Sequence, residues 1–260
     1  GPEVTVPLRR MVWGVAEADL GKGYRIKLAG TRGRMGAIRA QGAAGGGGYR
    51  PRLVFASSVA VFGAPLPEPV PEDHALTPLT SYGTQKAICE LLLADYTRRG
   101  ILDGIGIRLP TICVRPGRPN KAASGFFSSI IREPLVGEEA VLPVSEDVRH
   151  WHASPRAAVG FLVHAATLEG EAVGPRRTLD MPGVSVSVGE QIAALRRVAG
   201  NAAVARIRRE PDAGIARIIA GWPRAFAPAR AHALGFRAEE SFDAIIRVHI
   251  EDELGGRVPG

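Results

Sequence analysis

Apolar and polar residues follow one another along this chain in two patterns, which predict strands and helices in turn. Short, continuously apolar runs predict buried strands, and stretches with apolar residues three or four positions apart predict helices. The expected strands are residues 53–61, 104–108, 140–144, 148–153 and 177–181. The expected helices are residues 16–39, 81–99, 124–132, 156–168, 188–199 and 241–254. Strands that alternate with helices predict a parallel α/β sheet.

Other local signals refine these boundaries. Thr80 or Ser81 is the expected N-cap of one helix, and Ser187 is the expected N-cap of another. Residues 42–48 are rich in glycine and predict a flexible loop. Residues 65–78 are rich in proline, which excludes regular structure there.

Composition places the chain among ordinary globular proteins. Its 260 residues are enough to bury a full core, and 45% of them are hydrophobic and 23% charged. No apolar run reaches the roughly eighteen residues that span a bilayer, so no membrane partner is expected. No charged and then apolar leader opens the chain, so we expect a cytoplasmic protein. Cys89 and Cys113 lie in apolar contexts, which favours two buried thiols over a disulfide.

The net charge of +7 comes mainly from scattered arginines. The densest cluster contains Arg206, Arg208 and Arg209, and it is followed at once by Glu210. No aromatic residues alternate with this cluster, as they do in many nucleic-acid interfaces. We therefore expect no nucleic-acid partner, and a surface that at most attracts small anionic metabolites.

Tyr82 and Lys86 are the residues that point most clearly to chemistry. Their spacing of four places both side chains on one face of the expected helix 81–99. A nearby ammonium favours the phenolate form of a tyrosine, which can then move protons near neutral pH. A surface pair on an amphipathic helix is the alternative, but the position shortly after an apolar strand favours a catalytic pair.

Ser57 and Ser58 lie toward the end of that apolar strand. Either hydroxyl can hydrogen-bond a substrate oxygen, but strand alternation sends the two side chains to opposite faces. Only one of them can therefore contact the reacting oxygen. Ser58 is the first candidate for this catalytic role, and Ser57 is the next candidate for contact with the substrate.

Two further patterns have competing interpretations. Ser124 opens the expected helix 124–132 and either caps it or binds an anion at its N-terminus, with capping favoured. His150 and His152 share one face of an expected strand, which invites a metal-binding interpretation. No Asp, Glu or Cys at ligand spacing accompanies them, so no metal site is predicted.

These segments together resemble the extended short-chain dehydrogenases/reductases, the group that contains NAD-dependent epimerases and dehydratases. The stretches that carry the resemblance are residues 52–63, 80–93, 108–117, 124–133, 149–160, 181–200 and 241–255. The resemblance implies a Rossmann-like, doubly wound parallel sheet that is incomplete at its N-terminus, with a smaller C-terminal substrate-binding lobe. The implied dinucleotide-binding domain is residues 1–110 and about 147–182, and the implied lobe is residues 111–146 and about 183–260.

The resemblance also implies an activity. The expected enzyme oxidises a secondary hydroxyl of a small sugar acid, such as D-erythronate, with NAD as cofactor. Tyr82 is then the general base, Ser58 hydrogen-bonds the same oxygen, and Lys86 holds the nicotinamide ribose. The alternatives are a nucleotide-sugar epimerase or dehydratase with the same chemistry, and a non-catalytic homologue. A homodimer through a two-helix face near Tyr82 is also implied.

Three further binding residues follow from the resemblance. Pro110 and Thr111 leave the end of a strand, where the family places the nicotinamide, although an ordinary strand exit is equally open. Arg149 matches an arginine that contacts the anionic part of the substrate, and a guanidinium suits a carboxylate. A surface salt bridge from Arg149 to Glu146 or Asp147 is the equally weighted alternative.

One part of the family pattern is missing from the sequence. The family opens with a strand, a Gly-x-x-Gly-x-x-Gly turn and a helix, which together hold the pyrophosphate. Gly45 to Gly48 precede a strand instead of following one, so they cannot form that turn. Residues 24–31 resemble the helix before the catalytic strand, but Lys27 stands where the family carries a proton-relaying asparagine. We therefore expect recognisable catalytic residues and only part of the dinucleotide cradle.

Overall fold

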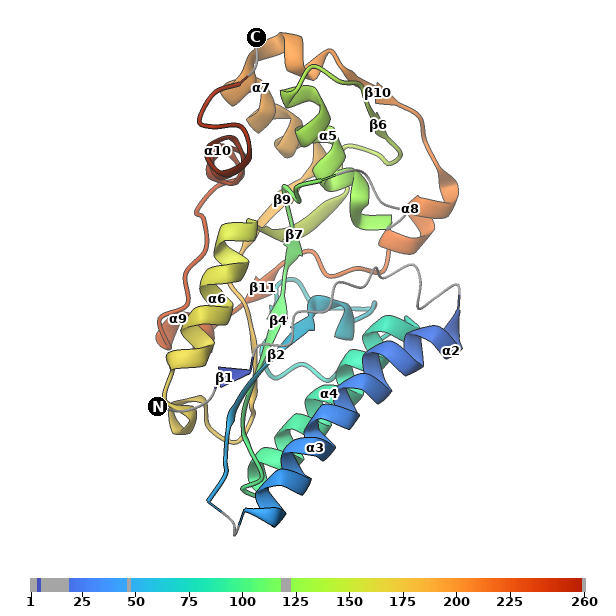
Figure 1. The fold of residues 1–260 in the computed structure, drawn as a ribbon. Coiled ribbons are helices and arrows are strands. Elements are labelled where there is room, and N and C mark those ends of the chain that lie inside the picture. The colour runs from blue at the N-terminus through green and yellow to red at the C-terminus, as the bar shows by residue number, and fades with distance from the viewer. Residues whose placement is uncertain (1–3, 6–18, 46–47, 118–122, 259–260) are drawn as a thin grey trace.

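A twisted parallel sheet forms the centre of the larger part of the molecule. The computed structural model describes residues 4–5, 19–45, 48–117 and 123–258. Its main sheet has the strand order β1-β2-β4-β8, and all neighbouring strands are parallel (Figure 1). These strands are β1 (Val4–Thr5), β2 (Arg52–Ser58), β4 (Asp103–Leu109) and β8 (Thr178–Asp180). The parallel α/β architecture predicted from the sequence is therefore confirmed.

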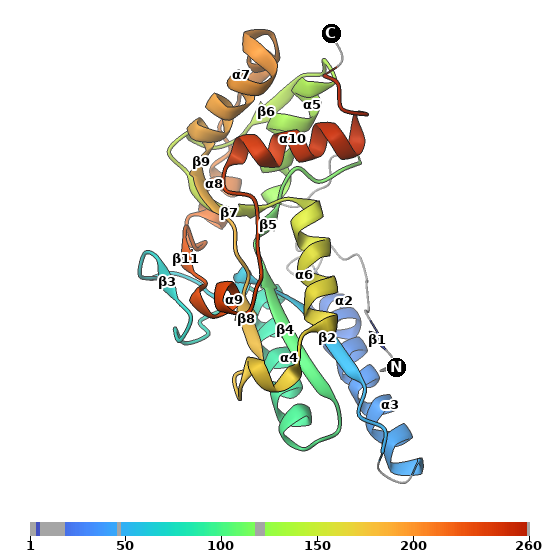
Figure 2. The ribbon, with the colours of Figure 1, turned by 90° about the vertical axis from the view of Figure 1, so that its left-hand side faces the viewer.

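Helices cover both faces of this sheet. One face carries two long helices side by side, and the other carries α6 (Figures 1 and 2). The two helices are α3 (Gly30–Ala44), which continues α2 (Leu20–Gly23) and a π-helical segment (Tyr24–Ala29), and α4 (Ser81–Arg98); α6 is Pro155–Thr167.

Alternation along β2 explains this two-sided burial. Leu53 and Phe55 pack in the cluster that contains Met35 of α3 and Leu93 of α4, whereas Val54 packs in the cluster that contains Phe161 of α6. A strand with both faces covered therefore has the continuous apolar run seen in its sequence.

A second lobe lies at one end of the sheet. Its core gathers apolar residues from α5, α7 and α10. Figure 1 shows these three helices at the end of the molecule that carries the C-terminus. The helices are α5 (Phe126–Leu135), α7 (Val188–Val204) and α10 (Phe242–Glu253), and β6 (Ala140–Leu142) pairs in parallel with β10 (Ile207–Arg209) beside them. A three-stranded sheet, β5-β7-β9, connects the lobe to the rest of the chain. Its strands are β5 (Thr111–Ile112), β7 (Arg149–Ala153) and β9 (Val184–Ser187).

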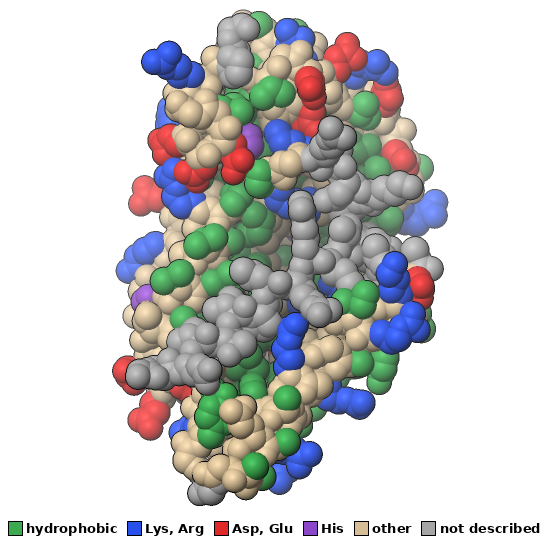
Figure 3. Space-filling model, in the orientation of Figure 1, with side chains coloured by type: hydrophobic (Ala, Val, Ile, Leu, Met, Phe, Trp, Pro, Cys, Tyr) green, Lys and Arg blue, Asp and Glu red, His purple; other side chains and the backbone are tan. Residues whose placement is uncertain are grey.

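Short elements complete the fold. They are β3 (Val70–Pro71), which pairs in parallel with β11 (Phe226–Ala227), and the helices α8 (Ala213–Ile219) and α9 (Ala229–Ala233). The expectation of no regular structure at residues 65–78 is therefore wrong at the two residues of β3. On the face shown in Figure 3, Lys and Arg side chains are spread over the molecule with Asp and Glu between them. Cys89 and Cys113 are both buried and unpaired. Across the described residues, no helix has the length and apolar character needed to cross a bilayer.

Several predicted boundaries need correction. The strand expected at 53–61 ends at Ser58, because Val59–Val61 forms a 3-10 turn. The loop expected at 42–48 is wrong for residues 42–44, which continue α3, and residues 46–47 lie outside the described residues. Residues 16–18 of the helix expected at 16–39 also lie outside them. The caps Thr80 and Ser187 are confirmed, and Ser187 forms a full capping box with Glu190.

Candidate active site

Tyr82 and Lys86 lie one turn apart at the start of α4. The helix begins here because the Thr80 hydroxyl accepts a 3.0 Å hydrogen bond from the Gly83 N–H, which satisfies one of the free donors of the first turn. The Lys86 ammonium donates to the Ala56 carbonyl at 2.5 Å and lies 5.8 Å from the centre of the Tyr82 ring. Lys86 is therefore tied to strand β2 and held beside the tyrosine.

A second ammonium approaches Tyr82 from the π-helical segment. The Lys27 Nζ lies 4.1 Å from the centre of the Tyr82 ring, which is a cation–π distance. Burial, together with the charge of Lys86, lowers the pKa of Lys27 to about 8. Two lysine side chains from different segments therefore lie beside the ring of one tyrosine.

Ser58 lies at the carboxyl end of β2, next to the start of α4. Its hydroxyl accepts a 3.2 Å hydrogen bond from the Ala60 N–H and so caps the 3-10 turn that follows. The helix packs tightly on this turn, because a Cβ atom on Gly83 would lie only 2.0 Å from the Ala60 carbonyl oxygen. Glycine next to Tyr82 thus permits direct contact between the two elements, which brings Ser58 and Tyr82 to the same end of the sheet.

Ser57 belongs to a buried polar network instead. Its side chain is 3% exposed, and its hydroxyl donates to Glu90 of α4. Arg108 of β4 donates to the same carboxylate at 2.8 Å and to Asp180 of β8 at 3.1 Å. Burial raises the pKa of Asp180 to about 6, against the opposing effect of the guanidinium. The structure therefore ties Ser57 to this network and not to the Tyr82 pair.

The sequence contained only a partial signal for this network. Glu90 interrupts an apolar helix face and Arg108 interrupts an apolar strand, and both are buried. A buried charge needs a partner of opposite charge, so an ion pair could have been expected for each of these two residues. The identity of the partners depends on the tertiary fold.

Pro110 and Thr111 leave β4 as predicted, and Thr111 contacts His150. Pro110 is buried, and Thr111 Oγ1 lies 2.7 Å from His150 Nε2. His150 Nδ1 lies 2.9 Å from the Pro223 carbonyl, which can only accept, so this nitrogen carries the proton. Burial lowers the pKa of His150 to about 4, so its Nε2 accepts from the Thr111 hydroxyl at neutral pH. Thr111 Oγ1 therefore keeps acceptor capacity toward a ligand.

His152 has a structural contact of its own. Its Nε2 lies 3.0 Å from Gln191 Nε2. Within the described ranges, no group of three His, Cys, Asp or Glu side chains has an arrangement that could hold a metal ion.

Arg149 forms an ion pair different from the one expected. Its guanidinium lies 2.9 Å from the Glu190 carboxylate and donates to the Ser185 carbonyl at 2.9 Å. Glu146, one of the two partners expected from the sequence, pairs instead with Arg209 at 2.6 Å. The Arg149 side chain is 34% exposed, so it can still be reached by a ligand.

Ser124 does not cap α5. It lies in the 3-10 turn Ala123–Gly125, and α5 begins at Phe126 with Gly125 at the N-cap position. The Ser124 hydroxyl accepts a 3.2 Å hydrogen bond from Arg115. The capping role favoured from the sequence is therefore wrong, and the hydroxyl serves to position Arg115.

The described residues fit one end of a dinucleotide better than the other. The hydroxyl and ammonium groups of Tyr82, Lys86 and Thr111 are suited to a nicotinamide and its ribose. Gly30, Gly33 and Gly36 have the spacing of a pyrophosphate turn, but they lie inside α3 and do not join a strand to a helix N-terminus. These glycines therefore cannot cradle a pyrophosphate.

Comparison with known sequences shows the family. A sequence model of the NAD dependent epimerase/dehydratase family matches residues 5–166. A D-erythronate dehydrogenase of Cupriavidus necator is 50% identical over 245 residues, which cover 94% of this chain and 74% of that protein. A D-erythronate dehydrogenase of Haemophilus influenzae is 44% identical over 239 residues, which cover 92% of this chain and 74% of that protein.

Solved structures agree with this relationship. A structure described as a nucleoside-diphosphate-sugar epimerase from Agrobacterium tumefaciens is 66% identical, with a TM-score of 0.93, and the match covers 96% of this chain and 73% of that chain. An L-threonine dehydrogenase from Cupriavidus necator has the same fold at 20% identity, with a TM-score of 0.82, over 94% of this chain and 77% of its own. The chain therefore belongs to the NAD dependent epimerase/dehydratase family, within the group that its sequence resembles.

Proposed function

We propose that this protein oxidises a secondary hydroxyl of a small sugar acid, such as D-erythronate, with NAD as the cofactor. The relatives named D-erythronate dehydrogenase, at 50% and 44% identity over more than nine-tenths of the chain, support the substrate class. The observation that carries the chemistry is Tyr82, flanked by Lys27 and Lys86 at the end of the sheet where Ser58 also lies.

Tyr82 is the proposed general base. Its phenolate oxygen takes the proton of the substrate hydroxyl, while Ser58 donates a hydrogen bond to the same oxygen and holds it in place. Bound NAD supplies the hydride acceptor for the carbon that carries this oxygen. Lys86 has two proposed tasks, which are to favour the phenolate and to hold the nicotinamide ribose. Pro110 and Thr111 are the proposed neighbours of the nicotinamide.

Arg149 is the proposed contact for the substrate carboxylate. A planar guanidinium can hold a carboxylate through two parallel hydrogen bonds. Arg149 already holds the Glu190 carboxylate at 2.9 Å, so substrate binding would exchange one carboxylate partner for another. Ser57 and Ser124 are weaker candidates for substrate contact, because their hydroxyls are engaged with Glu90 and Arg115.

The proposed division of labour follows the two parts of the molecule. Residues 1–110 and about 147–182 would bind the cofactor, and residues 111–146 and about 183–260 would select the substrate. We further propose a cytoplasmic homodimer. Two buried free thiols suit a reducing compartment. Ile88 and Leu91 of α4, 37% and 66% exposed, offer apolar surface for a partner subunit.

An assay of NADH formation tests the proposed function. The purified protein is incubated with NAD and D-erythronate, and in parallel with erythritol, which has the same carbon chain without the carboxylate. We expect NADH to form with D-erythronate and much more slowly with erythritol. NAD-saturable binding without any turnover of four-carbon sugar acids would contradict the proposal.

A second candidate function has one specific observation in its favour. The structure at 66% identity is described as a nucleoside-diphosphate-sugar epimerase, and epimerisation uses the same kinds of residues. Nucleotide sugars are therefore included in the assay, with product analysis by chromatography. Epimer formation without net NADH would support this candidate, and a failure to bind NAD in calorimetry would indicate a non-catalytic homologue.

A further inference from the structure

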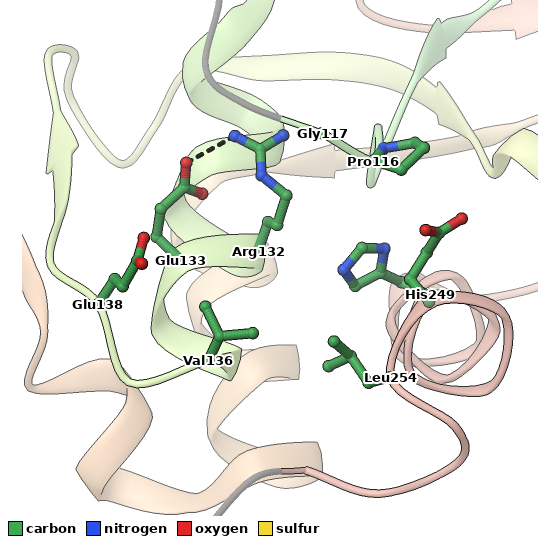
Figure 4. Close-up of a pocket in the computed structure, with 9 residues that line it drawn as sticks. Pro116, Gly117, Arg132, Glu133, Val136, Glu138, His249 and Leu254 are labelled. Carbon is green, nitrogen blue, oxygen red and sulfur yellow. Dashed lines mark hydrogen bonds and ion pairs between the residues drawn. The ribbon is translucent and has the colours of Figure 1, made fainter.

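A pocket opens between α5 and α10 in the second lobe, built from residues that have no part in the proposed chemistry (Figure 4). Its volume of about 280 Å³ is near the lower end of the range for small-molecule sites. The pocket is lined by Pro116, Gly117, Arg132, Glu133, Val136, Glu138, His249, Glu253 and Leu254.

Two buried polar side chains in this pocket have atoms without a hydrogen-bond partner. His249 is 3% exposed, and neither of its ring nitrogens forms a hydrogen bond. Glu133 is 6% exposed, and its Oε2 also has no partner, whereas its Oε1 pairs with Arg132 at 2.6 Å. Figure 4 shows the His249 ring directed from α10 toward Arg132 and Glu133 of α5. Buried polar atoms nearly always have a hydrogen-bond partner. Three such atoms without one at a single pocket therefore indicate that a bound molecule supplies their hydrogen bonds.

The charges of the lining residues restrict what that partner can be. Arg132 is the one guanidinium in the lining, and it already donates to the Arg115 carbonyl and to Glu133, each at 2.6 Å. Glu133, Glu138 and Glu253 bring three carboxyl groups to the same pocket. An anionic ligand such as a sugar acid would therefore meet net repulsion here.

The hydrogen-bonding needs restrict the partner further. Burial lowers the pKa of His249, and the charge of Arg132 acts in the same direction, so the ring is neutral near pH 7. A neutral imidazole offers one donor and one acceptor, and Glu133 Oε2 offers an acceptor. The ligand must therefore both donate and accept at His249 and must donate at Glu133. Hydroxyl groups on neighbouring carbons do both.

We propose that this pocket binds a small, uncharged polyol or monosaccharide through the His249 ring and the Glu133 carboxylate. The proposal does not depend on the activity proposed for Tyr82, because no residue of that site lines the pocket. It also separates two classes of ligand, since the charged sugar acid and the neutral polyol would bind at different places.

Histidine-detected NMR tests the proposal directly. The ring nitrogens of the six histidines are observed in 15N-labelled protein during titration with erythritol and with glucose. The His249 signals are identified by their loss in His249→Gln. We expect a saturable shift of these signals with at least one polyol, no such shift with D-erythronate, and unchanged signals from the exposed His232.

Binding to variants by calorimetry gives the second readout. His249→Leu should weaken polyol binding at least tenfold, and His249→Gln should retain part of it, because an amide supplies a donor and an acceptor. Glu138→Gln, at an exposed position in the lining, tests the pocket without disturbing a buried residue and should weaken binding only slightly. An unshifted His249 spectrum with both polyols would mean that the pocket holds only water, and equal affinity in His249→Leu would place the polyol elsewhere. Either result overturns the proposal.

Discussion

The Lys27 ammonium lies 4.1 Å from the centre of the Tyr82 ring, and the Lys86 ammonium lies 5.8 Å from the same centre. The two lysines come from different helical segments, yet they share one phenol. Their mutual repulsion is part of the reason that the pKa of Lys27 is lowered. Both lysine side chains therefore lie beside the ring of the proposed general base.

Replacement of Lys27 by methionine should change how stability depends on pH. Lys27 has a pKa of about 8 in the folded protein against 10.5 ordinarily, so between these values the unfolded chain holds a proton that the folded chain has lost. The stability of the natural protein therefore rises with pH across this window, relative to Lys27→Met. Urea unfolding at several pH values measures the difference. Lys22→Met, at an exposed position, should give a parallel curve and serves as the control.

Lys86→Ala should move the pH optimum of the oxidation upward and weaken NAD binding. In the proposed site, the substitution removes both the positive charge beside the general base and a contact to the ribose. Lys86→Arg keeps the positive charge, so its pH optimum should lie closer to that of the natural protein. A pH–rate profile and a calorimetric NAD titration measure the two effects. An unaltered profile in Lys86→Ala would show that the charge does not act on Tyr82.

Gly83→Ala should reduce activity because it displaces Tyr82, although it removes no group that takes part in the proposed chemistry. The added Cβ would lie 2.0 Å from the Ala60 carbonyl oxygen, so the start of α4 must move away from the turn that follows Ser58. Overpacking of this kind costs about 1–3 kcal/mol, and it separates Tyr82 from the serine. Thr84→Ala, at the exposed next position of the helix, is the matched control. The midpoint temperature of thermal unfolding and the kcat should both be lower in Gly83→Ala. Full activity of this variant would argue that the close contact between Gly83 and Ala60 is not needed.

Arg108→Met should destabilise the protein by about 3–5 kcal/mol, because it leaves the buried carboxyl groups of Glu90 and Asp180 without their cation. The loss should be smaller at low pH. Burial raises the pKa of Asp180 to about 6, so this carboxyl group becomes neutral and less costly below that pH. Arg156→Met removes the exposed ion pairs with Glu251 and Asp252 and should change stability little. Denaturant unfolding at pH 5 and pH 8 compares the two variants, and equal losses would contradict a buried network.

The sequence was sufficient for the parts of this fold that depend on local patterns. The strands β2 and β4 and the helices α4, α6, α7 and α10 are long enough to show their periodicity. The spacing of Tyr82 and Lys86, and the cap at Thr80, are likewise local properties of one helix. The strands β3, β10 and β11 have only two or three residues each, too few for a pattern, although β6, the partner of β10, lies within the strand expected at 140–144.

The parts that sequence reasoning missed join distant segments. Glu90 and Asp180 meet Arg108 from positions 18 and 72 residues away, and nothing near any one of them specifies the other two. Lys27 departs from the family pattern in the sequence, but its contact with Tyr82 depends on how the π-helical segment Tyr24–Ala29 packs against α4. Ser124 was assigned to a helix start because its type suits a cap, whereas the structure uses its hydroxyl to bind Arg115.

The measurement that tests the central claim most directly is the kcat of Tyr82→Phe with D-erythronate and NAD. This substitution removes only the phenolic oxygen that is proposed to take the substrate proton. We predict that kcat falls by about 10²–10⁴-fold, while the far-ultraviolet circular dichroism stays unchanged. Tyr96→Phe, further along the same helix, should keep its activity. A Tyr82→Phe protein that turns over at the natural rate would contradict the account.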